Sequence, residues 1–319
     1  MIRLKRLLTQ RKKSFFGGEM VRAFSALICL GVICALLSGC ALNGFEPAGT
    51  AGQPNKKAHH STADGDSGHS LRVIFLDVGQ GASQLLISPS GETMLIDAGN
   101  NSEEQHMLDY LREYGVTRLD IVIGTHPDAD HIGGLDRVIE NVDVGQIYMP
   151  KISSNTKTFE SLLRAIRGKG LKVKTAKAGL SLDWDEQVRV DMIAPVATTD
   201  DKNNMSAVVK VSYGDTSFLL TGDAERESEE AMIESGADLR ADVLLVGHHG
   251  SKSSTSPRFL DRVRPEYAVI QVGDNSYGHP TKTVLDRLAK QRIQVYRNDL
   301  QGTVEIDSDG RELQILTER

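Results

Sequence analysis

The chain has 319 residues, of which 39% are hydrophobic and 25% charged, and its formal net charge at pH 7 is −6. This composition is ordinary for a globular protein, and an aromatic content of 5% gives no sign of a stacking platform for nucleic-acid bases. All three cysteines lie within the first forty residues, which excludes disulfides, thiolate zinc ligands and a cysteine nucleophile from the rest of the chain.

The first forty residues have the pattern of an export signal. A short basic start precedes an apolar run over residues 23–37, which is too short for a comfortable membrane span. The run ends at Leu-Ser-Gly-Cys, which resembles the lipobox of bacterial lipoproteins, with Cys40 lipidated as the mature N-terminus. We therefore expect a signal peptide over residues 1–39, with Met20 as an alternative start, and a lipid anchor at the extracellular face of a bacterial cell membrane. An uncleaved anchor helix is the alternative.

The next segment, residues 40–69, is rich in Gly, Ala, Ser, Thr and Pro and cannot bury a core, so we expect a flexible tether. Removal of residues 1–39 would take away seven Lys or Arg and one Glu, leaving 30 basic and 42 acidic side chains and a formal charge of −12. Such a surface attracts no polyanion at long range, which weighs against avid, non-specific DNA binding.

Order is expected from Leu71 onwards. Short apolar or alternating runs predict strands, and apolar residues at helical spacing predict helices. In the first half of the domain, the predicted strands cover residues 71–78, 84–88, 93–97, 120–125, 145–150 and 171–176. The predicted helices cover residues 103–115, 134–142 and 158–170.

The second half shows a similar order. Its predicted strands cover residues 188–195, 206–213, 216–223, 241–247, 267–272, 293–298, 303–307 and 312–316. Its predicted helices cover residues 224–236, 258–263 and 281–291. Strands dominate the opening of each half and helices interleave later, so we expect an α/β fold with two mixed sheets covered by outer helices. The two halves would fit an internal duplication, which periodicity alone does not establish.

Residues 125–134 read THPDADHIGG and concentrate ionisable side chains at the end of a predicted buried strand, where α/β sheets place their sites. Isolated buried charges cost on the order of several kcal/mol. A divalent cation would turn these carboxylates and imidazoles into ligands and remove their mutual repulsion. A solvated loop with capping aspartates would explain Asp128 and Asp130, but not His126 and His131 beside them.

Several motifs in register resemble the metallo-β-lactamase-fold superfamily, whose signature is HxHxDH, and more closely the extracellular hydrolase domain of the ComEC/Rec2 competence proteins. These motifs are FLDVGQG (75–81), LIDAGN (95–100), THPDADHIGG (125–134), NNMS (203–206), LLTGDAE (219–225), VGHHGSKSS (246–254) and YGHP (277–280). The resemblance implies a four-layer αββα sandwich over residues 70–319, with two mixed sheets, outer helices and a site for two divalent metal ions.

The resemblance implies a metal ligand at each of six positions, namely His126, Asp128, Asp130, His131, Asp223 and His248. The first two would face one metal and the next two the other, with Asp223 bridging both ions and His248 completing the second site. Asp97 would fix the orientation of a ligand. For Asp223 alone, an N-cap of the helix over residues 224–236 is the alternative.

The sequence departs from the family pattern at two places. The third histidine of the first metal site has no equivalent, and NNMS occupies that region, where Asn204 or Ser206 is available. ComEC-like domains share this replacement. Oxygen ligands favour Mn²⁺ or Mg²⁺ and imidazoles favour Zn²⁺, so the mixed set leaves Zn²⁺ and Mn²⁺ as the candidate ions. Ala82 stands where the family commonly has Asp, which removes one polar group near the site.

Further candidates lie in the same motifs. His249 adjoins an expected ligand, so both a supporting hydrogen bond and a catalytic role are open. His279 lies in a loop shaped by Gly and Pro, where it could bind a phosphate or protonate a leaving group. Together with Asp130 it is the candidate catalytic residue, and Ser251 is a candidate for ligand support or substrate contact.

Two metals bridged by one aspartate would lower the pKa of a shared water and generate hydroxide at neutral pH. We therefore expect a metal-dependent hydrolase, and by similarity a phosphodiesterase or nuclease acting on extracellular DNA or RNA. The acidic surface and few aromatics keep open a hydrolase of smaller esters, such as teichoic-acid phosphocholine, nucleotides or lactones. A non-catalytic surface lipoprotein is the third hypothesis. No protein partner is predicted.

Overall fold

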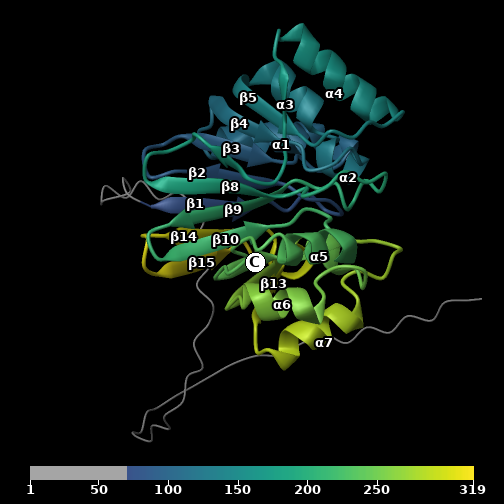
Figure 1. Ribbon diagram of the computed structural model, residues 1–319. Coiled ribbons are helices and arrows are strands. Elements are labelled where there is room, and N and C mark those ends of the chain that lie inside the picture. The colour runs from purple at the N-terminus through teal and green to yellow at the C-terminus, as the bar shows by residue number, and fades with distance from the viewer. Residues whose placement is uncertain (1–69) are drawn as a thin grey trace, which may run out of the picture. The chain divides into compact units, whose positions relative to one another are not determined.

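Within residues 70–319, fifteen strands form two mixed sheets that lie face to face (Figure 1). The structure is a computed structural model and describes residues 70–319. The predicted signal peptide (residues 1–39), the lipidated Cys40 and the predicted tether (residues 40–69) lie outside the described residues. Within residues 70–319, no helix is long and apolar enough to cross a membrane.

Sheet A has eight strands, in the spatial order β15 (Leu313–Thr317), β14 (Val304–Ser308), β1 (Leu71–Phe75), β2 (Gln84–Ile87), β3 (Thr93–Ile96), β4 (Arg118–Ile123), β5 (Asp143–Met149) and β6 (Val173–Thr175). Sheet B has seven, in the order β13 (Gln294–Arg297), β12 (Tyr267–Ile270), β11 (Val243–Leu245), β10 (Thr216–Leu220), β9 (Val208–Tyr213), β8 (Val188–Ala194) and β7 (Leu180–Leu182).

The helices are α1 (Glu104–Glu113), α2 (Ala129–Ile132), α3 (Leu135–Asn141), α4 (Lys157–Gly168), α5 (Arg226–Glu234), α6 (Pro257–Val263), α7 (Lys282–Lys290) and α8 (Asn298–Gln301). Two short 3-10 turns are η1 (Asn101–Glu103) and η2 (Gly247–Gly250).

Both sheets combine an antiparallel half with a parallel half. In sheet A the neighbours from β15 to β3 pair antiparallel, and those from β3 to β6 pair parallel. In sheet B the strands from β7 to β10 pair antiparallel, and those from β10 to β13 pair parallel. Helices connect the parallel strands, as parallel pairing requires. The two sheets therefore repeat one plan, and the expected pair of mixed sheets is confirmed.

Three apolar clusters fill the spaces between four layers. The central cluster joins side chains of both sheets, such as Phe75 and Phe218. A second cluster packs α1, α3 and α4 on the outer face of sheet A through residues such as Leu111 and Phe159. A third packs α5, α6 and α7 on sheet B through residues such as Met232. Strands that are buried along their whole length, such as β3 and β11, have sequences that are apolar or nearly so. The αββα sandwich is confirmed (Figure 1).

The shortest elements escaped the prediction from sequence, because three or four residues carry too little periodicity. The most important of these short elements is α2, which lies inside THPDADHIGG, where we expected a loop. Gly133 explains why a glycine must follow it. A Cβ atom at this position would lie 2.3 Å from the Asn101 amide nitrogen and 2.4 Å from the Ala129 carbonyl oxygen. The glycine thus allows the metal-binding motif to pack against η1.

A pair of carboxylates on sheet A shares one arginine. In the β1–β14 ladder, Arg72 lies opposite Asp307, two residues from Glu305. Arg72 Nε donates to Glu305 Oε1 at 2.7 Å but lies 3.7 Å from Asp307 Oδ1. That oxygen is buried without a hydrogen-bond partner among residues 70–319. Burial and the charge of Glu305 raise the pKa of Asp307 from 3.8 to about 6.

We expect Asp307→Asn to stabilise the protein at neutral pH. Because the pKa of Asp307 is raised in the folded state, the folded protein binds the carboxyl proton more tightly than the unfolded chain does. Its stability therefore falls as the pH rises from about 4 to about 6, and it stays lower at higher pH. Asparagine removes the buried charge, and its amide can still donate to Glu305. The expected increase in the free energy of unfolding at pH 8 is on the order of 1 kcal/mol, a figure that is reduced because Asp307 is partly exposed to solvent. This increase corresponds to roughly 2–4 °C in Tm.

Thermal unfolding at pH 8 and at pH 4.5 measures this effect. At the lower pH Asp307 is already protonated in the folded state, so the gain should vanish there. An equal gain at both pH values would show that ionisation of Asp307 is not the cause.

Candidate metal centre

The candidate site lies where the parallel strands of both sheets end. Asp97 directly follows β3, and His126 lies three residues beyond β4. Asp223 lies three residues beyond β10 of sheet B, and His248 and His249 lie in η2 after β11. The carboxyl ends of parallel strands in a sheet share one edge, so loops that are distant in sequence meet here.

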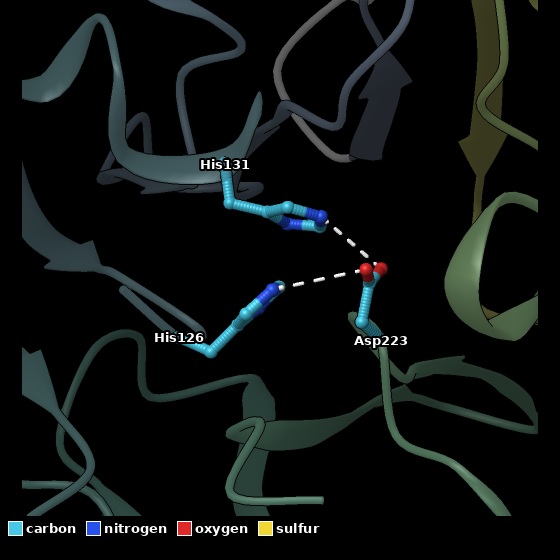
Figure 2. A group of neighbouring side chains, drawn as sticks. All are labelled: His126, His131 and Asp223. Atoms are coloured by element: carbon cyan, nitrogen blue, oxygen red, sulfur yellow. Dashed lines mark ion pairs between the residues drawn. The ribbon is translucent and has the colours of Figure 1, made fainter. Parts of the chain in front are cut away.

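Asp223 stands among four imidazoles, and its two carboxylate oxygens divide them into two pairs. Oδ1 lies 3.1 Å from His131 Nε2 and 3.6 Å from His249 Nε2. Oδ2 lies 3.7 Å from the Nε2 atoms of both His126 and His248. Figure 2 shows His126 and His131 pointing at this carboxylate. One aspartate therefore faces both pairs at once.

One further carboxylate joins each pair. Asp130 Oδ2 lies 3.5 Å from His249 Nε2, and Asp128 Oδ2 lies 3.8 Å from His126 Nε2. We call Asp130, His131 and His249 the Oδ1 group, and His126, Asp128 and His248 the Oδ2 group. The Oδ1 group is the more enclosed, because its His249 side chain is 3% exposed whereas that of His248 is 24% exposed.

Asp97 orients one imidazole of each group. His131 Nδ1 donates to Asp97 Oδ2 at 2.7 Å. His126 Nδ1 donates to Thr125 Oγ1 at 3.1 Å, and this hydroxyl donates in turn to Asp97 Oδ2 at 2.6 Å. Both rings therefore turn Nε2 toward Asp223. A metal-binding histidine is held in this way, with its other nitrogen donating to a carboxylate or a similar acceptor.

Two residues that sequence reasoning left unassigned orient the other imidazoles. His248 Nδ1 donates to Glu225 Oε1 at 2.9 Å, and His249 Nδ1 donates to the Gln271 carbonyl oxygen at 2.7 Å. In the sequence, Glu225 looks like an acidic residue at the start of a helix. Gln271 contributes a backbone atom, which any residue would supply. Only the motif LLTGDAE gave a signal for Glu225, and nothing in the sequence pointed to Gln271.

The donor atoms fit divalent metal ions. His126 Nε2 is buried and has no hydrogen-bond partner among the residues that the structure describes, so its lone pair faces the carboxylates. The ligand atoms of His126, His131 and Asp223 lie within 4.8 Å of one another, and so do those of Asp130, His131 and His249. Imidazole nitrogens and carboxylate oxygens are the usual ligands of Zn²⁺ and occur also with Mn²⁺.

The electrostatics of the cluster favour ionised carboxylates. Burial opposes ionisation of Asp223, but the charges of His131 and His249 hold its pKa well below the usual range. Burial likewise opposes ionisation of Asp130, but the hydrogen bond with His249 and the charge of His131 lower its pKa to about 2. Both carboxylates are therefore ionised at neutral pH and ready to bind a cation.

The two histidines of the first motif differ in protonation. Burial, and then the charge of His131, lower the pKa of His126 to about 4, so this ring is neutral at pH 7. Burial also opposes protonation of His131, but the carboxylates of Asp223 and Asp97 raise its pKa well above the usual value. A metal ion that binds His131 must therefore displace a proton, which makes binding weaker at acid pH.

Ser206 and His279 lie beside the Oδ2 group. Ser206 Oγ lies 3.4 Å from His126 Nδ1 and accepts the Asp223 backbone N–H at 3.2 Å. The His279 ring packs edge-on against His248, with centroids 5.5 Å apart. Burial and the neighbouring His248 lower the pKa of His279, so this ring is neutral at pH 7.

The hydrogen bonds of Asn204 and Ser251 run to the surrounding loops. Asn204 Oδ1 accepts the Ser228 backbone N–H at 3.0 Å, which ties its loop to α5. Ser251 Oγ lies 2.8 Å from Ser253 Oγ. We expected both residues to support ligands or substrate, and that role stays a prediction.

The adjacent histidines differ from the expectation. We expected His248 to complete the site of Asp130 and His131, with His249 in support. The structure places His249 in that group and His248 in the Oδ2 group, where we expected no further histidine. Both residues have left-handed backbone conformations, with φ of 49° and 52°, and this tight turn sends the neighbouring rings to different oxygens of Asp223.

We expect Asp97→Asn to weaken metal binding by roughly 10- to 100-fold, the range for loss of a ligand's orienting partner. Asn tolerates the positive φ of 59° at this position, so the backbone should keep its course. The amide cannot accept from His131 and Thr125 as the carboxylate does. Competition with a chromophoric chelator measures affinity, and circular dichroism checks the fold. Wild-type affinity in a folded variant would contradict this role.

Comparison with known proteins finds the same family over most of the domain. Residues 77–274 match the model of the metallo-beta-lactamase superfamily. ComE operon protein 3 of Bacillus subtilis (strain 168) is 33% identical over 252 residues, which are 73% of this chain and 32% of that protein. Competence protein ComA of Neisseria gonorrhoeae is 32% identical over 237 residues, again 73% of this chain and 32% of that protein. The chain spans about a third of the length of these relatives.

A solved structure supports the fold. The metallo-beta-lactamase fold protein YhfI from Bacillus subtilis superposes with a TM-score of 0.50 and 11% sequence identity. The superposition covers 75% of this chain and 100% of that protein. At this identity the similarity concerns the arrangement of sheets and helices and not the chemistry.

Proposed function

This chain belongs to the metallo-beta-lactamase superfamily, and from that premise we propose that it is a binuclear metal-dependent hydrolase of phosphodiester bonds, with DNA or RNA as its substrate. The proposal assigns the reaction to residues 70–319. Zn²⁺ and Mn²⁺ are its candidate ions, because the donor set mixes imidazoles with carboxylates.

The observation that carries the proposal is the division of ligands by Asp223. Its Oδ1 faces the Oδ1 group and its Oδ2 faces the Oδ2 group. Each group contributes two imidazoles and one carboxylate, so two ions can share one bridging residue. Two such ions would supply an acidified water and positive charge for the developing negative charge of a phosphate ester under attack.

The protein's own residues hold this arrangement and handle protons. Asp97, Glu225 and the Gln271 carbonyl keep the Nδ1 atoms occupied as donors, so the Nε2 atoms stay available as ligands. Asp130 is the carboxylate of the Oδ1 group, with 30% of its side chain exposed, and it could accept a proton from the attacking water. His279, neutral and next to the Oδ2 group, is placed to donate a hydrogen bond to the leaving oxygen.

A cation at the mouth of the site supports an anionic substrate. Lys202 Nζ lies 3.0 Å from Asp128 Oδ1, and both side chains are more than one-third exposed. A phosphate entering from solvent would meet this ammonium group before it reaches the more enclosed Oδ1 group. Among candidate substrates, a phosphodiester uses this cation, whereas a neutral lactone does not. The similarity to a protein named as a competence protein also supports the proposal.

Export and lipid anchoring are part of the proposal. The apolar run over residues 23–37 and the following Leu-Ser-Gly-Cys support a lipidated Cys40 that holds residues 70–319 at the outer face of the membrane through the segment 40–69. Labelling cells with a fatty-acid probe tests this directly. Wild-type protein should carry the label and Cys40→Ser should not. An unlabelled wild-type protein would refute the anchor but leave the hydrolase proposal intact.

The test of the activity uses the full chain in detergent, loaded with Mn²⁺ or Zn²⁺. Substrates are plasmid DNA, RNA, bis-p-nitrophenyl phosphate, p-nitrophenyl phosphorylcholine and nitrocefin. The control is the double variant Asp130→Ala, His131→Ala, which removes two ligands of the Oδ1 group. The proposal predicts nucleic-acid cleavage that the control lacks.

Two other outcomes would redirect the assignment. Cleavage of bis-p-nitrophenyl phosphate or phosphorylcholine without nucleic-acid cleavage would favour a hydrolase of smaller esters, which the formal charge of −12 beyond residue 39 also suits. No turnover with either ion would favour a surface lipoprotein in which the metals are structural.

A further inference from the structure

The loop between β12 and α7 carries the most exposed large apolar ring in the described part of the chain. Tyr277 is 73% exposed, ahead of Leu300 at 60% and two valines near 40%. A single exposed ring is common on protein surfaces and needs no explanation. The position of this ring beside the metal centre is what makes it informative.

A row of rings connects Tyr277 to the ligands. The Tyr277 ring lies against His279, with centroids 5.8 Å apart and planes tilted by 33°. His279 packs edge-on against His248, whose Nε2 lies 3.7 Å from Asp223 Oδ2. A group resting on the exposed phenol would therefore lie one histidine away from the Oδ2 group.

The loop is fixed by hydrogen bonds within itself. Asn275 Oδ1 accepts the backbone N–H groups of Tyr277 and His279, each at 3.1 Å. Asn275 Nδ2 donates to the carbonyl oxygens of Gly273 and His279, each at 2.9 Å. One side chain thus sets the backbone on both sides of the tyrosine, so little conformational freedom remains to be lost when a ligand binds.

The same loop is locked to the turn that carries the histidine ligands. Thr281 N–H donates to the Gly250 carbonyl oxygen at 2.9 Å. Gly250 lies so close to Pro280 that a Cβ atom at the glycine would approach the proline Cβ to 2.5 Å. Because Gly250 ends η2, the tyrosine loop and the two histidines of that turn are held together.

We propose that Tyr277 is a stacking platform for a nucleobase next to the scissile phosphate, and that the substrate is therefore single-stranded or locally unpaired nucleic acid. This inference rests on the proposed phosphodiesterase function and names its substrate class. A base in an intact duplex has no free face, whereas an unpaired base can lie on an aromatic ring whatever its identity. Lys202 near Asp128 provides a contact for the phosphate, and Tyr277 provides one for the base.

The low aromatic content of the chain does not conflict with this proposal. A composition of 5% aromatic residues gives no sign of an extended row of stacking rings, but it allows one ring at one site. With an acidic surface and one stacked base, binding would be weak and local, as suits an enzyme that trims strands and not a protein that coats them.

The test compares full-length Tyr277→Ala and Tyr277→Phe with wild type in the Mn²⁺-loaded form. Substrates are a fluorescent DNA 10-mer, the same strand with abasic residues, and a duplex. Wild type should prefer the intact single strand. Tyr277→Ala should raise KM for that strand by roughly 10-fold with kcat within about 2-fold, because loss of a stacked base weakens binding. Tyr277→Phe should restore KM, and no variant should change KM for the abasic strand.

Fluorescence anisotropy of strand binding keeps the test independent of turnover. If wild type cleaves no nucleic acid, the proposed function fails, yet tighter binding of intact over abasic strand that is lost in Tyr277→Ala would still support the platform. Equal KM and Kd for wild type and Tyr277→Ala, or an equal loss on the abasic strand, would overturn it. Val173→Ala, at an exposed position on β6, is the matched control and should behave as wild type.

Discussion

Asp223→Asn is expected to remove both of the proposed metal ions and nearly all of the proposed hydrolytic activity. Each oxygen of Asp223 faces one ligand group, so this single substitution weakens both sites, whereas any other ligand substitution affects one. Asparagine keeps the shape and removes the charge that two cations would share. We expect the fall in kcat/KM to exceed the roughly 100-fold cost of losing a partner that only orients a ligand.

Metal content after dialysis and hydrolysis of the best substrate measure this result. Asp215→Asn is the matched control, because Asp215 is exposed at the opposite end of β10. Loss of the Asp223 carboxylate also leaves the protonated His131 with less compensation, so circular dichroism should confirm that the variant folds. Asp223→Glu keeps the negative charge, so comparison of the two variants separates the loss of the charge from a folding defect. Two retained ions and wild-type turnover in folded Asp223→Asn would refute the bridging role.

His249→Ala and His248→Ala are expected to remove different ions. His249 lies with Asp130 and His131, so His249→Ala should release the ion of the Oδ1 group and leave about one equivalent bound. His248→Ala should release the ion of the Oδ2 group. Because both ions act in one reaction, we expect either variant to lose more than about 100-fold in kcat/KM.

Double variants decide how the two histidines are divided. Two substitutions in one group act on the same ion, so the second should cost little further metal. His131→Ala with His249→Ala should therefore retain about one equivalent, and His131→Ala with His248→Ala should retain none. The opposite pattern would restore the division expected from sequence, in which His248 completes the site of His131. Elemental analysis of dialysed protein distinguishes the two patterns.

Much of the fold was predictable from sequence, because the central strands are buried on both faces and leave apolar runs in the sequence. The strands that end at Ile96, Ile123 and Leu220 were recognisable in this way, and so were the helices with apolar residues at helical spacing. The four-residue helix α2 was not, because it is too short to show a helical period and two of its residues, Asp130 and His131, are candidate ligands. The order of the motifs supplied the family, which residues 77–274 confirm.

The sequence by itself indicated most of the candidate metal ligands, and placed His249 among them only as a supporting residue. Imidazoles and carboxylates that follow buried strands need a partner for their charge, and that requirement holds whatever the details of the loops. Only the tertiary structure decided how they group. His248 and His249 are neighbours in the chain, and their left-handed backbone sends one ring to each oxygen of Asp223. The roles of Glu225 and Gln271 in orienting imidazoles, and the exposure of Tyr277, likewise became visible only in three dimensions. The sequence fixes which chemical groups are present, whereas the direction in which each side chain points depends on the backbone angles of the folded chain.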